Sequence, residues 1–215
     1  MCNHLELTRT RRQSWTTLRT LQESGKYHNE FAVVDANHPG LISIQTVPIL
    51  AIGQRAFLCC TPKGNILWDC ITYLDYDTVQ RICERGGLKA IIISHPHYYS
   101  TSVVWAQIFD CPLYLSAEDQ EWVMRKDRRQ HLWEATRLNL FPDDGIDSGS
   151  DIVAVKTGGH FPGSSVLWWK SAKKLLVADS IMIVRSGVYH VDRLPNTISF
   201  TFMWSYPNMV RSCLY

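Results

Sequence analysis

The chain has 215 residues, a net charge of +2 at pH 7 and 46% hydrophobic residues. This length suits one domain with a substantial core, and the near-neutral charge without a basic stripe gives no sign of a nucleic-acid partner. No stretch approaches the roughly 18 to 20 apolar residues of a membrane span, and no apolar signal region opens the chain, so we expect a cytoplasmic protein without a membrane partner.

The first 40 residues are polar and poorly periodic, which indicates an N-terminal connector at 1–40 ahead of a domain at 41–215. A short helix is expected within residues 14–24, where Trp15, Leu18 and Leu21 recur at helical spacing. The domain should then open with a meander of three strands at residues 42–52, 55–61 and 66–69.

A helix should follow the meander. Asp75 or Asp77 can cap its N-terminus, and Gly86 with Gly87 can end it. An apolar run over residues 90–93 comes next, so the order strand, helix, strand is typical of a βαβ-like unit.

The apolar run at residues 90–93 ends abruptly in His95-Pro96-His97. Three consecutive isoleucines favour a strand that is buried on both faces and central in its sheet. Pro96 biases His95 towards an extended backbone, in which side chains two residues apart point the same way. We therefore expect His95 and His97 to face one spot beyond the strand end, although a bare His-x-His pair also occurs in surface turns.

The segments after His97 alternate between predicted helices and strands. A helix is expected to begin near residues 100–102, a short strand at 113–115, and a further helix at Ser116-Ala117-Glu118-Asp119, which resembles an N-cap with an acidic first turn. A hairpin is expected from strands at residues 165–170 and 174–177.

Two later segments add candidate ligands. His160 lies among three glycines in the stretch Thr157 to Ser164, and Asp179 ends the apolar run that begins at Leu175. Three imidazole nitrogens and one carboxylate suit zinc or another divalent transition metal.

In this order, His95, His97, His160 and Asp179 resemble the metallo-β-lactamase-fold hydrolases, whose motif is His-x-His-x-Asp-His, then a lone His, a bridging Asp and a final His. The resemblance covers roughly residues 40 to 190 and looks closest to an uncharacterised fungal branch with a His-Pro-His-Tyr-Tyr signature. It implies an α/β fold, an αββα sandwich of two facing mixed sheets with helices outside. We expect its C-terminal end to be truncated, because a short tail follows Asp179.

The resemblance also implies roles for the residues. His95, His97, His160 and Asp179 would be ligands of zinc, and metal-bound hydroxide would attack a lactam, ester or related acyl bond of a small-molecule substrate. Asp179 could also orient the water, and Asp69 would hold a ligand histidine in one tautomer. Tyr99, or its neighbour Tyr98, could donate a hydrogen bond to a developing oxyanion.

Two departures from the superfamily motif keep an alternative open. Tyr99 and Ser100 stand where the motif has Asp-His, which predicts one metal ion per chain. The final His has no counterpart, because only a short tail follows Asp179. His190 could stand in for this ligand, or it could be a structural histidine. The alternative is a catalytically inactive or weakly active metal-binding relative that acts as a binding protein. The apolar segment Phe200 to Val210 also predicts a protein partner or self-association.

Overall fold

The computed structural model describes residues 16–141, 150–183 and 200–202 of the chain. Its described α-helices are α1 (Leu18–Glu23), α2 (Tyr76–Cys83) and α3 (Ser102–Phe109), and its short 3₁₀ helices are η1 (Pro96–Tyr98), η2 (Ala117–Trp122) and η3 (Ala178–Ser180). Asp75 caps α2 through a side-chain bond from the Thr78 N–H, as predicted. No helix in this part of the chain is long and apolar enough to cross a membrane.

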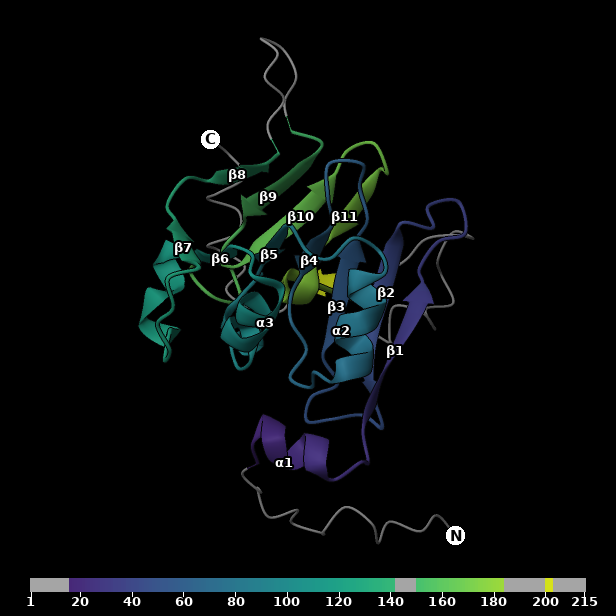
Figure 1. Cartoon of the computed structure of the whole chain (residues 1–215). Helices are drawn as coiled ribbons and strands as arrows, with labels where there is room; N and C mark the ends of the chain where they lie inside the picture. Colours follow the sequence, from purple (N-terminus) through teal and green to yellow (C-terminus); the bar gives the residue numbers. More distant parts are fainter. Residues whose placement is uncertain (1–15, 142–149, 184–199, 203–215) are drawn as a thin grey trace, which may run out of the picture.

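The larger sheet has seven strands in the order of the sequence: β1 (His28–Val33), β2 (Leu41–Val47), β3 (Arg55–Cys59), β4 (Ile66–Trp68), β5 (Ala90–Ile92), β6 (Leu113–Ser116) and β7 (Gln130–Trp133). The first four strands pair antiparallel, and β4 to β7 pair parallel. Helices α2 and α3 make the crossovers on either side of β5 and lie in front of the sheet in Figure 1. The predicted βαβ-like unit is therefore present.

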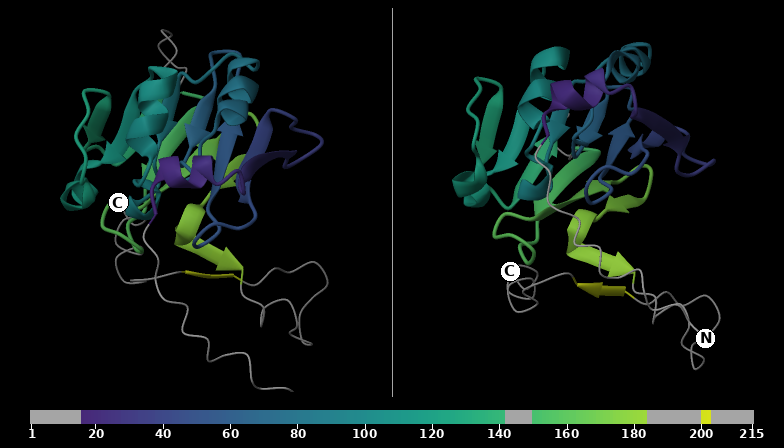
Figure 2. Two further views of the ribbon diagram at one scale, coloured as in Figure 1. Left: turned by 60° about the horizontal axis from the view of Figure 1, so that its bottom comes forward. Right: turned by 90° about the horizontal axis from the view of Figure 1, so that it is seen from below.

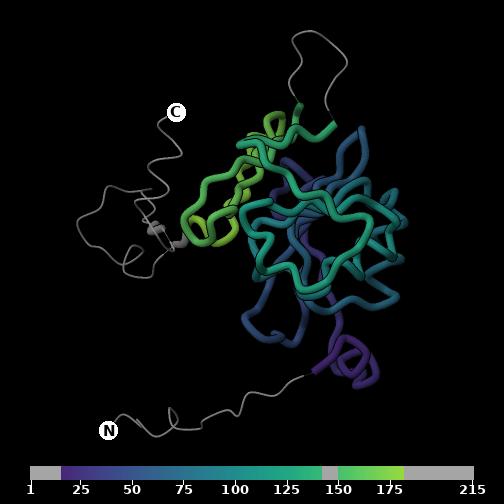
Figure 3. The backbone as a smooth tube through the Cα atoms, turned by 90° about the vertical axis from the view of Figure 1, so that its left-hand side faces the viewer, coloured from purple at the N-terminus to yellow at the C-terminus, as the bar shows by residue number. Residues whose placement is uncertain are grey.

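The second sheet has four antiparallel strands in the order β11-β10-β9-β8: β8 (Arg137–Leu140), β9 (Ile152–Lys156), β10 (Ser165–Trp169) and β11 (Lys174–Leu176). Figure 3 shows it in green as a layer beside the rest of the domain. Strands β12 (Ile181–Ile183) and β13 (Phe200–Phe202) pair in a separate ribbon, visible below the two larger sheets in Figure 2.

Strand β5 shows why its sequence is apolar on both faces. Ile91 belongs to the core between the large sheet and its helices, whereas Ala90 and Ile92 belong to the core between the two sheets. All three side chains are buried, and β5 lies between two parallel neighbours. The prediction of a buried central strand at this position is confirmed.

The observed layers match the predicted sandwich of two facing sheets. The smaller sheet is antiparallel rather than mixed, because each of its described strands pairs antiparallel with its neighbours. No α-helix occurs in the described residues after β8, so the described outer helices all belong to the larger sheet. The predicted truncation and the apolar segment 200–210, apart from the backbone of β13, lie outside the described residues.

One strand comes from the segment for which the sequence predicts a polar connector. Strand β1 pairs with β2 at the edge of the large sheet, and Asn29 is buried within it. The Asn29 side chain donates to the Tyr73 carbonyl (3.1 Å) and the Thr78 hydroxyl (2.9 Å), and it accepts from Thr46 (2.9 Å). These partners satisfy the amide, so a polar stretch can form part of the domain.

Candidate metal centre

Three histidines and one aspartate converge where the two sheets meet. His95 and His97 follow β5 of the larger sheet, whereas His160 lies between β9 and β10 and Asp179 follows β11 of the smaller sheet. The Asp179 Oδ2 atom lies 3.4 Å from His95 Nε2, 3.7 Å from His160 Nε2 and 3.9 Å from His97 Nδ1. The four donor atoms all lie within 4.8 Å of one another, so the predicted convergence is confirmed.

The backbone route to this convergence differs from the prediction. His95 is extended, with φ −167° and ψ 168°, but Pro96 begins the 3₁₀ turn η1 that carries His97. Proline suits the first position of a helical turn because it has no N–H to leave unpaired. The two imidazoles lie edge to face, 5.0 Å apart, and reach the same point through Nε2 of His95 and Nδ1 of His97. The extended conformation predicted for His95 is confirmed, but a turn at Pro96, rather than the alternation of an extended chain, brings His97 to the same point.

A hydrogen-bonded chain orients His95. The buried carboxylate of Asp69 accepts the Ser94 N–H (2.7 Å) and the Ser94 hydroxyl (3.0 Å). Ser94 Oγ also lies 2.8 Å from His95 Nδ1. Because the single hydroxyl proton of Ser94 points to Asp69, Ser94 Oγ accepts a hydrogen bond from His95 Nδ1–H, which leaves the lone pair on Nε2. The chain thus connects Asp69 to a candidate ligand through Ser94, a residue that the sequence did not single out.

The free nitrogen of His95 fits a metal ligand. His95 Nε2 is buried and has no hydrogen-bond partner among the described residues. An unpaired buried polar atom is costly, and a cation at the centre of the cluster would satisfy it. The donor set of three imidazole nitrogens and a carboxylate oxygen is one that zinc accepts. The residues present therefore fit a zinc-type ion.

The electrostatics of the cluster also favour cation binding. Burial, together with nearby His95, lowers the pKa of both His97 and His160 below the ordinary value. Contact with His95 and the other imidazoles holds the pKa of Asp179 below the ordinary value. Near neutral pH His97 and His160 therefore offer neutral imidazoles, and Asp179 offers an ionised carboxylate. Burial has the opposite effect on Asp69 and raises its pKa to about 7.

The loop that carries His160 is held by a residue that the sequence analysis assigned to another role. Asp119, in η2, is fully buried, and its Oδ1 accepts the Gly163 N–H at 2.8 Å. A Cβ atom on Gly163 would overlap Ser116 and lie 2.8 Å from Asp119 Oδ2, so the loop approaches too closely for a side chain. The stretch from Ser116 to Asp119 was predicted to be the acidic first turn of a helix, but it forms part of a 3₁₀ turn. Asp119 in this turn contacts the loop that carries His160.

Aromatic rings surround the cluster. Phe161 stacks on His95 at 5.7 Å and meets His97 and His160 edge to face at 5.1 and 4.9 Å. Trp122 meets the other side of Phe161 at 5.6 Å. These rings limit the freedom of the imidazoles and give the centre an apolar flank.

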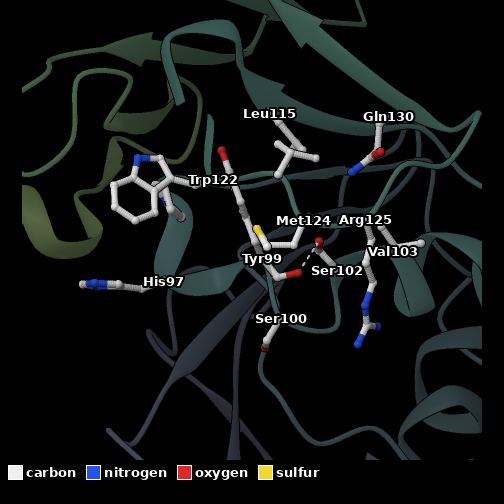
Figure 4. A pocket seen from close by; sticks show the side chains of 12 residues that line it. His97, Tyr99, Ser100, Ser102, Val103, Leu115, Trp122, Met124, Arg125 and Gln130 are labelled. Atoms are coloured by element: carbon white, nitrogen blue, oxygen red, sulfur yellow. Dashed lines mark hydrogen bonds between the residues drawn. The ribbon is translucent and has the colours of Figure 1, made fainter. Parts of the chain in front are cut away.

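Tyr98 and Tyr99 occupy different surroundings. Tyr98 is buried and packs edge to face on His95 at 5.1 Å. The Tyr99 hydroxyl is buried and has no hydrogen-bond partner among the described residues, and burial raises its pKa above the ordinary value. Tyr99 and His97 line one cavity, shown in Figure 4. The neutral phenol of Tyr99 can donate a hydrogen bond to a ligand. His190, the other candidate residue, lies outside the described residues.

The cluster is partly open to solvent. The side chain of His95 is 1% exposed and that of His160 is 9% exposed, but that of His97 is 44% exposed and that of Asp179 is 32% exposed. A substrate can therefore approach the cluster at His97 or at Asp179. Among the described residues, this is the one group of three or more His, Cys, Asp or Glu side chains whose donor atoms lie close enough to share a metal ion.

One known protein resembles almost the whole chain. The chain is 41% identical over 202 residues to the uncharacterized protein YmaE of Bacillus subtilis (strain 168), a match that covers 92% of the chain and 66% of that protein. The chain therefore spans slightly less than two thirds of the length of this relative.

Solved structures share the fold at low sequence identity. TMB-1 superposes with a TM-score of 0.57 at 17% identity over 78% of each chain. The DIM-1 metallo-beta-lactamase superposes with a TM-score of 0.58 at 12% identity, over 74% of this chain and 73% of its own. The sequence profile described as the Metallo-beta-lactamase superfamily matches residues 52–207, which include all four donors. The chain belongs to the metallo-beta-lactamase superfamily.

Proposed function

We propose that the protein is a zinc-dependent hydrolase that cleaves a lactam, ester or related acyl bond of a small molecule. The observation that carries this proposal is the convergence of three imidazole nitrogens and one carboxylate oxygen within 4.8 Å. The buried Nε2 atom of His95, which has no partner among the described residues, supports metal binding over a merely structural histidine cluster.

Zinc in such a donor set acts as a Lewis acid and lowers the pKa of bound water to about 7. The protein groups then have separate tasks. Asp69 and Ser94 keep His95 in the tautomer whose Nε2 faces the cluster. The ionised Asp179 accepts a hydrogen bond from the attacking water and orients it towards the acyl carbon. In hydrolysis, the water oxygen bonds to that carbon, the acyl C–O or C–N bond breaks, and the leaving group takes the proton.

Tyr99 is our candidate for stabilising the developing oxyanion. Its hydroxyl is unpaired among the described residues, and its raised pKa keeps the proton on the phenol at neutral pH. A donor that is free before substrate binds can direct its proton at the charge that forms during attack. Tyr98 packs on His95 instead, so we assign it a structural role.

A metal-binding relative without hydrolytic activity is the second candidate. Tyr99 and Ser100 favour it, because they occupy the positions at which the superfamily motif has Asp-His. The Ser100 hydroxyl lies 3.2 Å from the Thr72 hydroxyl, so its described partner is another hydroxyl group. Both candidates predict one zinc ion per chain, and turnover distinguishes them.

The experiment combines metal analysis with a substrate panel. The purified protein is loaded with zinc, its metal content is measured by mass spectrometry, and hydrolysis of aryl esters, thioesters and a chromogenic lactam is followed. We expect one equivalent of zinc and turnover of at least one class. His95→Ala should lose both, whereas His28→Ala, a change at an exposed histidine in β1, should lose neither.

The outcomes separate the candidates. Stoichiometric zinc without turnover of any compound supports the binding protein and contradicts the hydrolase. A wild-type protein without zinc contradicts both. Two equivalents bound with similar affinity contradict the proposal of a single ion.

We also propose a cytoplasmic location. The described cysteines Cys59, Cys60, Cys70, Cys83 and Cys111 are free thiols, which suits a reducing compartment. The resemblance of His95-Pro96-His97-Tyr98-Tyr99 to a fungal branch stays a prediction, as does association through the apolar segment 200–210.

A further inference from the structure

A cavity of about 380 Å³ opens beside the metal centre, and we call it the His97 cavity because His97 forms part of its wall. Its volume lies in the range of small-molecule sites. Besides His97, the lining residues used below are Tyr99, Trp122, Met124 and Arg125. His97 is also the most exposed of the four candidate ligands, so this cavity reaches the cluster at its most accessible ligand.

The His97 cavity contains a cation that has no described counter-ion. Arg125 lines it, and no carboxylate among the described residues pairs with Arg125. Arg129, four residues along, is instead held by Asp110 (2.8 Å) and Asp127 (3.2 Å). None of the described residues that line the cavity is acidic. An anion inside it would therefore meet a guanidinium group without competition from a fixed carboxylate.

A second cavity of similar volume adjoins the metal centre from the side of Asp179 and gives a useful contrast. Both Asp69 and Asp179 line it, together with Arg55. Its lining therefore sets two acidic side chains beside one guanidinium, whereas the described lining of the His97 cavity holds a guanidinium and no acidic side chain. This contrast between the two linings favours an anion in the His97 cavity.

Part of the wall of the His97 cavity is formed by large apolar side chains. Trp122 is 49% exposed and Met124 is 90% exposed, although large apolar side chains are usually buried. The Trp122 ring contacts Phe161, which in turn contacts the rings of His95, His97 and His160. The ring of Phe161 thus connects the imidazoles of the metal centre to the Trp122 wall of the cavity.

Figure 4 shows the order of these groups. His97 and Arg125 lie at opposite sides of the lining, with Tyr99 and Met124 between them. We propose that the substrate is an amphipathic carboxylate, with its scissile acyl group at the His97 end, an apolar middle against Trp122 and Met124, and its carboxylate on Arg125. This inference rests on the proposed hydrolase function and adds the substrate class to it.

Two matched esters test the proposal in the zinc-loaded protein. Monophenyl glutarate carries a carboxylate at the far end of its acyl chain, and phenyl pentanoate has a similar chain without the charge. In both, the water oxygen bonds to the acyl carbon, the C–O bond breaks and phenol leaves with the proton. We expect a higher kcat/KM for the glutarate ester. Arg125→Gln should lower that value about fivefold, mainly through KM, and leave the pentanoate ester unchanged.

Arg128→Gln is the matched control, because it removes the same charge from an exposed residue that does not line the cavity. It should change neither ester. If Arg125→Gln affects both esters equally, or neither, the inference about the carboxylate is wrong while the hydrolase proposal stands.

If neither ester is cleaved, that result contradicts ester hydrolysis itself. The inference about the carboxylate is then tested by binding measurements instead. Calorimetry then compares 4-phenylbutyrate with its neutral amide. Tighter binding of the carboxylate, lost in Arg125→Gln but kept in Arg128→Gln, supports the inference. Equal affinities for the two compounds, or a preference that survives Arg125→Gln, overturn it, because the carboxylate would then bind elsewhere, such as on the metal.

Discussion

The carboxylate of Asp119 accepts the backbone N–H of Gly163 at 2.8 Å and so joins η2 to the loop that presents His160. The two residues lie 44 positions apart, and no side chain would fit at Gly163. The position of one candidate ligand therefore depends on a carboxylate that is itself outside the cluster.

Asp119→Ala should weaken zinc binding about tenfold or more, because groups that hold metal ligands in place typically contribute 10- to 100-fold to affinity. Asp119→Asn should retain most of the affinity, since its amide oxygen can still accept the Gly163 N–H. Titration against a competing chelator measures both. Equal loss in the two variants would show that the charge of Asp119, rather than its hydrogen bond, matters.

Ser94→Ala should also weaken zinc binding by about 10- to 100-fold, because it removes the hydroxyl between Asp69 and His95. The NMR signals of His95 should then report a mixture of tautomers in the zinc-free protein. Ser102→Ala is the control, since Ser102 donates to the Tyr99 carbonyl outside the cluster. The proposed role of Ser94 fails if the two variants bind zinc equally well.

The stability of the fold should fall in acid partly through Asp151. Burial raises the pKa of Asp151, but hydrogen bonds to its carboxylate outweigh this effect and hold the pKa below the ordinary value. The donors are the Ser171 N–H (2.8 Å), the Ser171 hydroxyl (2.7 Å) and the Trp169 ring N–H (2.9 Å). The unfolded carboxyl takes up its proton near pH 4, before the folded one does. Asp151 thus stabilises the fold above about pH 4, and the contribution is lost as the pH falls through the lower folded value.

Asp151→Asn should therefore lower stability at pH 7 and flatten its dependence on pH below about 4. Urea unfolding at a series of pH values measures this slope. Glu134→Gln, at an exposed residue in the same half of the chain, should leave the slope as in the wild type. An unchanged slope in Asp151→Asn would contradict the assignment.

The core between the sheets should be sensitive to lost volume. Leu167 in β10 is fully buried there, so Leu167→Ala should cost about 2–5 kcal/mol of unfolding free energy. Leu175 in β11 is 53% exposed, and Leu175→Ala should stay within about 0.5 kcal/mol. Urea denaturation of the two variants tests whether the smaller sheet packs on the larger one as described.

The candidate ligands could be predicted from the sequence because each follows a segment with a strong local signature. His95 and His97 follow an isoleucine-rich strand, His160 lies among glycines, and Asp179 ends an apolar run. Such signatures place residues at element ends, where side chains from neighbouring strands meet. The superfamily resemblance supplied the order of the motif and the two facing sheets.

The missed features depend on contacts that are distant in sequence. From its neighbours in the sequence, Asp119 resembled part of a helix start. Its hydrogen-bond partner Gly163 is 44 residues away, so no nearby residue indicates the contact. Strand β1 looked like a connector because the groups that satisfy Asn29 lie up to 49 residues away. The turn at Pro96 replaced an extended backbone, since proline is compatible with both conformations.

The division of the donor atoms between the two sheets links metal binding to folding. His95 and His97 follow a strand of one sheet, and His160 and Asp179 follow strands of the other. An ion held by all four crosslinks the sheets and is released when they separate. Free zinc at 100 times its dissociation constant would then add about 2.7 kcal/mol to the stability of the domain. Zinc supply would thereby govern how long the folded protein survives, independently of any catalytic turnover.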